Sequence, residues 1–373
     1  MARETDVTRR GISRRTLLAG AGGAGTAAAL GAFGSYAWAA QNPVAKLPLP
    51  STSTLRVLVT GDAGTGSDQQ WAVARAARRV CAERGVDLAL GLGDNIYENG
   101  PEEVNDDEFA TKFEQPNEGI DVPWLMVLGN HDTSGIIPGS GGRPSRGDHE
   151  VAYHHHSARW YMPARHYSVA IPDPRADRPV AEFFALDTTP LSSYVLQTDP
   201  RYYWDGPFAR EQRAWLDASL TASRARWKFV FAHHPLRNNG SHGNAGAYEG
   251  ITCGDYISGK HVKELYEQVV RGRAEFLLSG HDHSLQVLDT APEYGGTQQL
   301  VCGAAAKTTG RAARPDNRAF WEAYDTLGFM FLTVTAERVR VDAYTVDPGT
   351  SVPTLAYSGD RTDRLTRTGA PVR

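Results

Sequence analysis

The chain has 373 residues, with 39 lysine and arginine residues against 43 aspartate and glutamate residues and a formal net charge of −4. With 41% hydrophobic and 22% charged residues, its composition excludes a disordered chain, a collagen-like fibre and a disulfide-dense miniature domain. The slight acidic excess argues against nucleic acid as a binding partner, because neutralising phosphates requires a surplus of basic side chains. The length allows one large α/β domain or two smaller ones.

Residues 1–39 are predicted to be an export signal and not part of the fold. Arg14 and Arg15 stand in a Ser-Arg-Arg-x-Leu-Leu run, which a Gly/Ala-rich apolar stretch follows, and small residues suit cleavage after Ala39. The run resembles a twin-arginine signal, which implies that the twin-arginine translocase exports the folded protein to the periplasm, the cell surface or the medium. A transmembrane anchor is the alternative, but Gly and Ala dominate the stretch, and Leu and Ile are few. We expect no membrane span after removal of the signal.

A proline-rich linker over residues 40–54 is followed by what we predict to be a single domain over residues 55–373. Removal of the signal leaves a more acidic chain, so a phosphorylated substrate needs a local positive site. The cysteines, Cys81, Cys253 and Cys302, are an odd set. We expect buried free thiols, with a Cys253–Cys302 disulfide as the alternative.

Strand-like and helix-like patterns alternate along the chain. Short apolar runs predict strands at residues 55–60, 86–92, 122–128, 180–186, 228–232 and 274–279. Helical periods predict helices at residues 67–84, 210–220 and 259–270. This alternation is typical of an α/β protein with a largely parallel sheet. Four segments of the tail are predicted to be antiparallel strands: 285–288, 300–301, 329–334 and 339–346.

Residues 135–156 are rich in Gly, Pro, Arg and His, and they show neither the hydrophobic period of a helix nor that of a strand. We therefore predict a long surface loop there, which borders the site. A second loop, residues 191–207, contains several aromatic side chains. These two loops leave the size of the substrate open.

Polar side chains follow the predicted strands at the point where each strand ends. Asp62, Asp94 and Asn130 each come directly after an apolar run, and they lie 32 and 36 residues apart. One strand–helix–strand unit takes about 30 residues or more, so successive units bring these side chains to the edge where open α/β sheets bind ligands. The imidazoles follow later strands in the same way: His233, His281 and His283.

The types of these residues indicate a metal site. Residues two apart in an extended segment face the same side, so His281 and His283 converge while Asp282 points away. Mixed oxygen and nitrogen donors suit first-row transition metals better than calcium, and their number suits two ions that share a carboxylate. Taken singly, each residue also fits an ordinary turn or a buried core histidine. Five motifs in order, each at a strand end, are too many for coincidence.

The motifs resemble those of the calcineurin-like metallophosphoesterase superfamily. In order along the chain they are Gly61-Asp62-x-Gly64, Gly93-Asp94-x-x-Tyr97, Gly129-Asn130-His131-Asp132, His233-x-Pro235 and Gly280-His281-x-His283. Tyr97 narrows the resemblance to purple acid phosphatases, and the flanking residues are similar to those of the small, tartrate-resistant type. This resemblance implies a four-layer α/β/β/α sandwich.

The resemblance also implies which residues hold two metal ions. One ion, usually Fe(III), would be bound by Asp62, Asp94, Tyr97 and His283. The second, a divalent ion such as Fe, Zn or Mn, would be bound by Asp94, Asn130, His233 and His281, so that Asp94 bridges the two. His234 would then be a neighbour of the site and not a ligand.

The function that the resemblance implies is that of an exported acid phosphatase. A metal-bound hydroxide would attack the phosphorus of a small phosphate monoester, and His131 or His242 would orient the phosphate or protonate the leaving group. A phosphodiesterase or nucleotide hydrolase that uses the same metals is one alternative. A non-catalytic phosphate- or metal-binding surface protein is the other.

Overall fold

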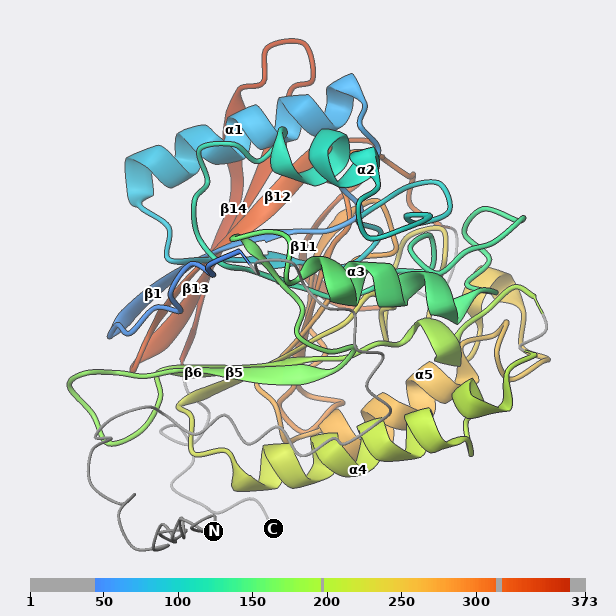
Figure 1. Cartoon of the computed structure of the whole chain (residues 1–373). Helices are drawn as coiled ribbons and strands as arrows, with labels where there is room; N and C mark the ends of the chain where they lie inside the picture. The colour runs from blue at the N-terminus through green and yellow to red at the C-terminus, as the bar shows by residue number, and fades with distance from the viewer. Residues whose placement is uncertain (1–43, 196–197, 313–316, 363–373) are drawn as a thin grey trace, which may run out of the picture. The chain divides into compact units, whose positions relative to one another are not determined.

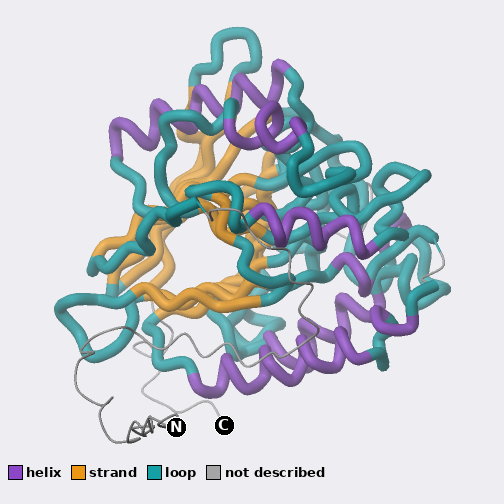
Figure 2. Tube along the Cα trace, in the orientation of Figure 1, coloured by secondary structure: helices purple, strands orange, loops and turns teal. Residues whose placement is uncertain are grey.

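The computed structural model describes residues 44–195, 198–312 and 317–362. The predicted signal at residues 1–39 lies outside them. The described residues form one compact unit. Two seven-stranded sheets pack face to face, and helices cover their outer faces (Figure 1; Figure 2). The predicted α/β/β/α sandwich is confirmed.

The first sheet contains the chain's first strands and its last. Its strands, in spatial order, are β14 (Pro353–Thr362), β13 (Arg338–Val346), β12 (Leu327–Thr335), β1 (Thr54–Thr60), β2 (Leu88–Gly91), β3 (Trp124–Met126) and β4 (Trp160–Tyr161). Pairing is parallel from β1 to β4 and antiparallel from β1 through β12 and β13 to β14.

The second sheet is built from the middle of the chain. Its strands, in spatial order, are β11 (Ala319–Ala323), β9 (Leu285–Leu288), β10 (Gln298–Cys302), β8 (Phe276–Ser279), β7 (Trp227–Phe231), β6 (Ala181–Ala185) and β5 (Tyr167–Ile171). The four strands from β10 to β6 are parallel, and the outer strands are antiparallel. The expectation of a largely parallel sheet therefore holds only for one half of the first sheet, β1 to β4, and for the centre of the second.

The central strands are largely apolar because both of their faces are buried. In β7, Phe229 and Phe231 face the core between the two sheets, whereas Val230 faces the core beneath α4 (Pro207–Ala222) and α5 (Lys260–Leu265). On the other side of the sandwich, α1 (Asp68–Arg84) covers the first sheet (Figure 1). The two sheets are exposed mainly along the edge strands β14 and β11.

Helix α1 begins and ends where its sequence predicts. The Ser67 side chain caps the first turn by accepting a hydrogen bond from the Gln70 N–H. Arg84 occupies the last turn, and Gly85 follows it with a φ of 73°, which an L side chain rarely adopts. The helix brings the chain back to the start of β2, parallel to β1.

The prediction of a long surface loop over residues 135–156 holds only for the first part of the segment. The segment contains a short 3₁₀ helix (Pro144–Arg146) and the seven-residue helix α3 (Gly147–Tyr153), in which Glu150 is fully buried. The Arg146 guanidinium donates hydrogen bonds to the carbonyls of Asn99 (2.9 Å) and Gly100 (2.8 Å). Two helical turns are too short to show a period, and the buried side chains are charged, so no apolar pattern marks the segment.

All three cysteines are free. The expected buried thiols are confirmed for Cys81 and Cys302, but Cys253 is exposed. The Cys302 thiol donates a hydrogen bond to the Val59 carbonyl, at an Sγ–O distance of 3.3 Å. This contact joins β10 to β1 and accounts for the burial of Cys302 between the two sheets.

Candidate metal centre

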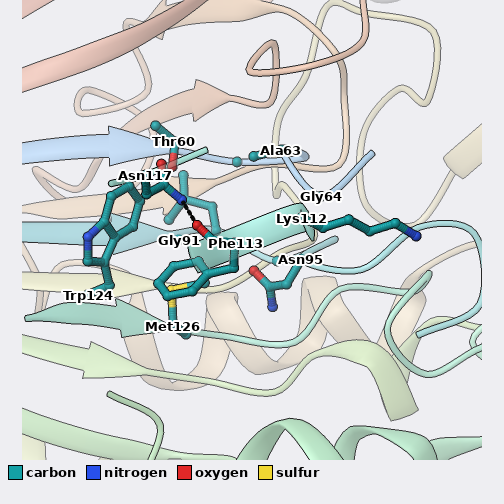
Figure 3. Close-up of a pocket in the computed structure, with 13 residues that line it drawn as sticks. Thr60, Ala63, Gly64, Gly91, Asn95, Lys112, Phe113, Asn117, Trp124 and Met126 are labelled. Atoms are coloured by element: carbon teal, nitrogen blue, oxygen red, sulfur yellow. Dashed lines mark hydrogen bonds between the residues drawn. The ribbon is translucent and has the colours of Figure 1, made fainter. Parts of the chain in front are cut away.

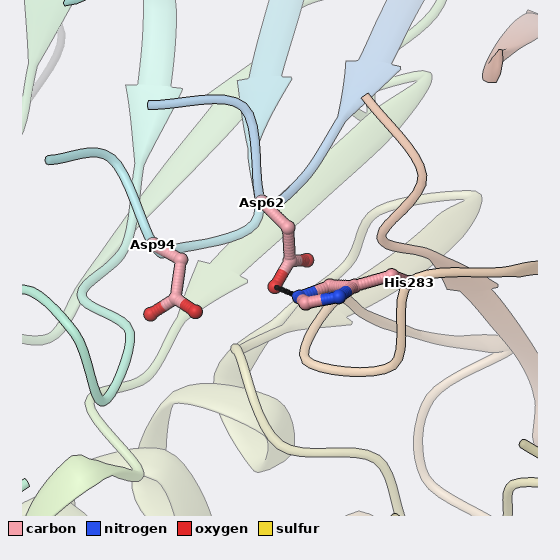
Figure 4. Close-up of side chains that lie close together, drawn as sticks. All are labelled: Asp62, Asp94 and His283. Atoms are coloured by element: carbon pink, nitrogen blue, oxygen red, sulfur yellow. Dashed lines mark ion pairs between the residues drawn. The ribbon is translucent and has the colours of Figure 1, made fainter. Parts of the chain in front are cut away.

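The predicted metal ligands gather where parallel strands of the two sheets end. Asp62, Asp94 and Asn130 follow β1, β2 and β3 of the first sheet, whereas His233 and the pair His281 and His283 follow β7 and β8 of the second. The site therefore lies at the edges of two sheets, not of one as the spacing alone suggested. Figure 4 shows Asp62, Asp94 and His283 converging from these strand ends.

Three of these residues occupy a backbone conformation that is unfavourable for their type. Asp62, Asp94 and His281 have φ values of 58°, 52° and 69°, a left-handed region that costs a non-glycine residue on the order of 1 kcal/mol or more. The strain is repeated at three separate strand ends. This conformation turns the backbone sharply after each strand, so that the side chain points back into the shared site.

The glycines beside the ligands are required by close packing. A Cβ atom on Gly129 would lie 2.2 Å from Oδ1 of Asp94, and one on Gly280 would lie 2.4 Å from Oδ2 of Asp62. Both distances are shorter than any van der Waals contact. The Gly-Asn and Gly-His pairs of the motifs therefore exist because a ligand from another strand occupies the space of a side chain.

The first donor cluster is formed by Asp62, Tyr97 and His283. The Tyr97 hydroxyl lies 3.3 Å from Oδ1 of Asp62 and 3.2 Å from Nε2 of His283. Nε2 of His283 lies 3.6 Å from the same Asp62 oxygen. Donor atoms of Asp62, Asp94 and His283 lie within 4.8 Å of one another, a spacing that one ion can fill.

The second donor cluster is formed by Asn130, His233 and His281. Oδ1 of Asn130 lies 2.8 Å from Nε2 of His233 and 2.9 Å from Nδ1 of His281. Oδ1 of Asp94 lies 3.4 Å from the same His233 nitrogen. Asp94 thus belongs to both clusters, as expected of a bridging ligand.

Hydrogen bonds outside the clusters aim the donor atoms inward. Nδ1 of His233 faces the Leu92 carbonyl at 2.9 Å, so Nδ1 carries the proton and Nε2 presents its lone pair to the site. The Asn130 amide nitrogen donates to the Gly139 carbonyl at 2.8 Å, which leaves Oδ1 facing the site. The lone pairs of these two side chains therefore converge, which is an arrangement that a cation stabilises.

The electrostatics of the protein also fit a cation. Burial, reinforced by the charge of Asp94, holds the pKa of the Asp62 carboxyl well above its usual range. Burial and the neighbouring carboxylates likewise raise the pKa of Tyr97. Burial lowers the pKa of His233 and His281, so both rings are neutral and able to coordinate. Two metal ions would balance these buried anionic donors.

The two predicted catalytic histidines lie on opposite donor clusters. The His131 ring lies 4.3 Å from the Tyr97 ring, and its Nδ1 faces the Glu98 carbonyl at 2.7 Å. The His242 ring lies 4.2 Å from the His281 ring. His234, expected to be a neighbour, has its Nδ1 2.9 Å from Oγ1 of Thr188.

The sequence motifs do not reveal the partner of His242. Nδ1 of His242 forms an ion pair and a short hydrogen bond with the Glu249 carboxylate, which also accepts from the Tyr194 hydroxyl at 3.3 Å. Against the effect of burial, Glu249 raises the pKa of His242. Glu249 lies in a single 3₁₀ turn, Tyr248–Gly250, at a φ of 55°, and no sequence motif includes it.

A second unpredicted group is a buried pair of acids beneath the ligand segments. The Asp132 carboxylate accepts hydrogen bonds from the backbone N–H groups of Gly129, Asn95 and Ile96 at 2.7 to 2.8 Å, and so joins the segments after β2 and β3. Its neighbour Glu150 comes from α3, and the side-chain amide of Asn95 donates to both carboxyls. Helix α3 thereby supports the segments that carry the predicted metal ligands.

Because of the buried pair Asp132 and Glu150, we expect the protein to lose stability as the pH rises. Burial raises the pKa of Asp132 to about 8, and burial together with Asp132 raises that of Glu150 well above its usual range. Between about pH 4 and pH 8 the folded chain thus binds more protons than the unfolded chain, and the free energy of unfolding falls as the pH rises. In the variant Glu150→Gln, the side chain keeps the size and shape of glutamate. Its amide group can donate a hydrogen bond to the Asp132 carboxylate, and it does not bind or release a proton in this pH range.

We expect the free energy of unfolding of Glu150→Gln to exceed that of the unmodified protein by on the order of 1–2 kcal/mol at pH 8 and to match it near pH 5. Urea unfolding at the two pH values measures the difference. The exposed residue Glu103 provides the control, since Glu103→Gln should leave both values unchanged. An equal pH dependence in Glu150→Gln would show that the pair does not retain a proton.

A small pocket lies behind the segments that carry Asp62 and Asp94 (Figure 3). Glycines of these segments and the side chains of Phe113, Trp124 and Met126 line it, and none of the seven predicted ligands does. A Cβ on Gly64 would lie 1.7 Å from the Asn95 carbonyl oxygen. The pocket is thus a gap beneath tightly packed turns and is separate from the donor clusters.

Comparisons with known proteins agree with the geometry. Residues 55–285 match the calcineurin-like phosphoesterase family. Purple acid phosphatase 4 of Arabidopsis thaliana is 28% identical over 312 residues, which cover 80% of this chain and 82% of that protein. Tartrate-resistant acid phosphatase type 5 of Homo sapiens is 30% identical over 284 residues, which cover 72% and 79%.

A solved structure, described as GAP50, the anchor in the inner membrane complex of Plasmodium, has the same fold. It matches with a TM-score of 0.64 over 84% of this chain and 90% of that chain, at 16% identity. The family implies a dinuclear metal centre, and the two donor clusters fit one. The chain therefore belongs to the calcineurin-like phosphoesterase family, in its purple acid phosphatase branch of the small, tartrate-resistant type, and is a metal-dependent phosphoric ester hydrolase.

Proposed function

We propose that this protein is an exported acid phosphatase that hydrolyses small phosphate monoesters at a dinuclear centre. Fe(III) would be held by Asp62, Asp94, Tyr97 and His283, and a divalent ion (Fe, Zn or Mn) by Asp94, Asn130, His233 and His281. The observation that carries the proposal is the pair of donor clusters that share Asp94. When bound, the two ions would screen the phosphoryl oxygens and lower the pKa of the attacking water.

The chain's own residues would orient the substrate and move a proton. His242 is placed to protonate the departing alkoxide, because the Glu249 carboxylate holds Nδ1 and leaves Nε2 available. His131 lies beside Tyr97, at the first donor cluster, where it would orient the phosphate. Donation from Nδ1 of His233 to the Leu92 carbonyl keeps its imidazole in one orientation while the charge on the phosphoryl group changes.

The small monoester is proposed from the resemblance, and two segments of the chain border the site that it would enter. Residues 135–156 and 191–207 contact each other, because the Ser140 carbonyl accepts hydrogen bonds from the Tyr194 N–H (3.0 Å) and the Ser193 hydroxyl (2.9 Å). The first loop also contacts the site, through the bond between Gly139 and Asn130. Comparing rates on aryl phosphate monoesters and diesters tests this proposal, and a strong diester preference would refute it.

Tyr97 provides a direct test of the iron assignment. A phenolate bound to Fe(III) gives a visible charge-transfer band. We expect the iron-loaded protein to show this band and Tyr97→Phe to lack it. The control is Tyr153→Phe. Tyr153 lies on α3, where its hydroxyl donates a hydrogen bond to the Glu114 carboxylate, so this substitution should leave the spectrum unchanged. Absence of the band from the iron-loaded unmodified protein would refute the Fe(III)–tyrosinate assignment.

Export is proposed from the sequence alone, since residues 1–39 lie outside the described structure. The Ser-Arg-Arg-x-Leu-Leu run and the small residues before Ala40 support a twin-arginine signal. Within the described ranges, no helix combines the length and the apolar character needed to cross a membrane. N-terminal sequencing of the exported protein tests the proposal, which requires a start at Ala40.

A further inference from the structure

A lysine lies over the aromatic ring of the proposed iron ligand. Nζ of Lys307 lies 3.7 Å from the centroid of the Tyr97 ring, well within the range of a cation–π contact. The Lys307 side chain is 31% exposed. No sequence motif includes this residue, which follows β10 in a segment without regular structure.

Two backbone hydrogen bonds hold Lys307 in this position. The Ala305 N–H donates to the Gly61 carbonyl at 3.3 Å, and the Thr309 N–H donates to the His283 carbonyl at 2.9 Å. Gly61 directly precedes the proposed ligand Asp62, and His283 is itself a proposed ligand. The residues before Lys307, Ala304 to Ala306, are buried. The segment is therefore attached, on both sides of Lys307, to the strand ends that form the first donor cluster.

A carboxylate lies beside the lysine. Oε1 of Glu98 lies 3.3 Å from Nζ of Lys307, and Oε2 of Glu98 lies 3.5 Å from Nδ1 of His131. Glu98 directly follows Tyr97 in the chain. The ammonium group thus lies over the phenol ring, and the carboxylate that pairs with it belongs to the residue next to Tyr97.

We propose that Lys307 is a positioning residue that acts through Tyr97: its ammonium group draws electron density toward the ring face and reduces the electron donation of the phenolate to the metal. This inference rests on the proposed function, because it requires Tyr97 to be a metal ligand. The phenolate-to-iron transition moves an electron out of the ring. A cation near the ring raises the energy of that transition, and a nearby anion lowers it.

The two charges therefore predict opposite spectral shifts. In the iron-loaded full-length protein, Lys307→Met should move the charge-transfer band to longer wavelength by on the order of 10 nm. Glu98→Gln should move it to shorter wavelength, and Lys307→Arg should restore the position seen in the unmodified protein. Because a general loosening of the site would shift both variants the same way, opposite signs identify a charge effect.

The outcomes separate this inference from the proposed function. A band that is absent from the unmodified protein contradicts the assignment of Tyr97 as an iron ligand. A band that is present but unmoved in Lys307→Met contradicts the role of Lys307 alone. Titration with inorganic phosphate gives a second measurement: an unmoved band together with weaker phosphate binding would make Lys307 a substrate contact and overturn the inference.

Discussion

Replacement of Asp94 by asparagine is expected to reduce kcat/KM for a phosphate monoester by at least about 10³-fold. We also expect the purified variant to hold fewer than two metal ions per chain. Asp94 is the residue that the two donor clusters share: its Oδ1 lies 3.4 Å from Nε2 of His233, and its carboxylate lies within 4.8 Å of the donors of Asp62 and His283. An amide supplies no negative charge and bridges two cations poorly.

Asparagine is the appropriate substitution because it preserves the backbone. Asp94 has a φ of 52°, and asparagine is one of the few residues that tolerate this region. The backbone N–H of His131 donates a hydrogen bond to Oδ1 of Asp94 at 2.9 Å, and the side-chain oxygen of asparagine can accept the same bond. The circular dichroism spectrum and the cooperativity of unfolding should therefore be unchanged.

The matched control is Asp255→Asn, since the Asp255 side chain is half exposed and forms its ion pairs with Lys260 and His261 of α5. It should retain full activity and full metal content. Metal analysis by mass spectrometry and steady-state kinetics on the same samples give both measurements. A variant Asp94→Asn that binds two ions and retains activity would show that Asp94 does not bridge the metals.

Removal of the His242 ring is expected to have the second largest effect, and its size should depend on the leaving group. His242→Ala should reduce kcat for an alkyl phosphate by about 10²–10³-fold, because the departing alkoxide needs a proton. For an aryl phosphate with an acidic phenol the loss should be under about tenfold, since that leaving group departs without one. His242 belongs to neither donor cluster, so metal content should be unchanged.

Glu249→Gln provides an intermediate case. The Glu249 carboxylate pairs with Nδ1 of His242 and raises its pKa, so the amide should reduce alkyl phosphate turnover without removing the ring. His131→Ala is the comparison for the other candidate, which lies against Tyr97. If His131→Ala shows the greater dependence on the leaving group, the proton donor is His131 and the assignment to His242 is wrong.

The sequence alone determined which residues gather at the site, because their signals are local. A short apolar run predicts a buried strand, and a Gly-Asp or Gly-Asn pair directly after it predicts a sharp turn at the strand's end. The structure places Asp62, Asp94 and Asn130 at such turns. The start of α1 was predictable for the same reason, since Ser67 caps the turn that follows it.

The tertiary structure decided how those residues meet. Spacing alone suggested a single sheet edge, whereas the ligands come from two sheets, and β1 and β8 lie more than 200 residues apart in the chain. The registers that bring Gly280 against Asp62 depend on the packing of both sheets. No local pattern encodes such a contact.

The residues that support and surround the site were likewise decided by long-range packing. Glu150 lies on a helix too short to show a period, Glu249 lies in a single 3₁₀ turn, and Lys307 lies in an irregular segment. Glu150 and Lys307 contact residues distant in sequence, whereas Glu249 contacts His242, which no motif connects with it. The sequence by itself thus determined the donor set, because each donor follows from a strand end a few residues long. Only the tertiary structure decided the charges around those donors, because a side chain's electrostatic partners are set by distance in space and not along the chain.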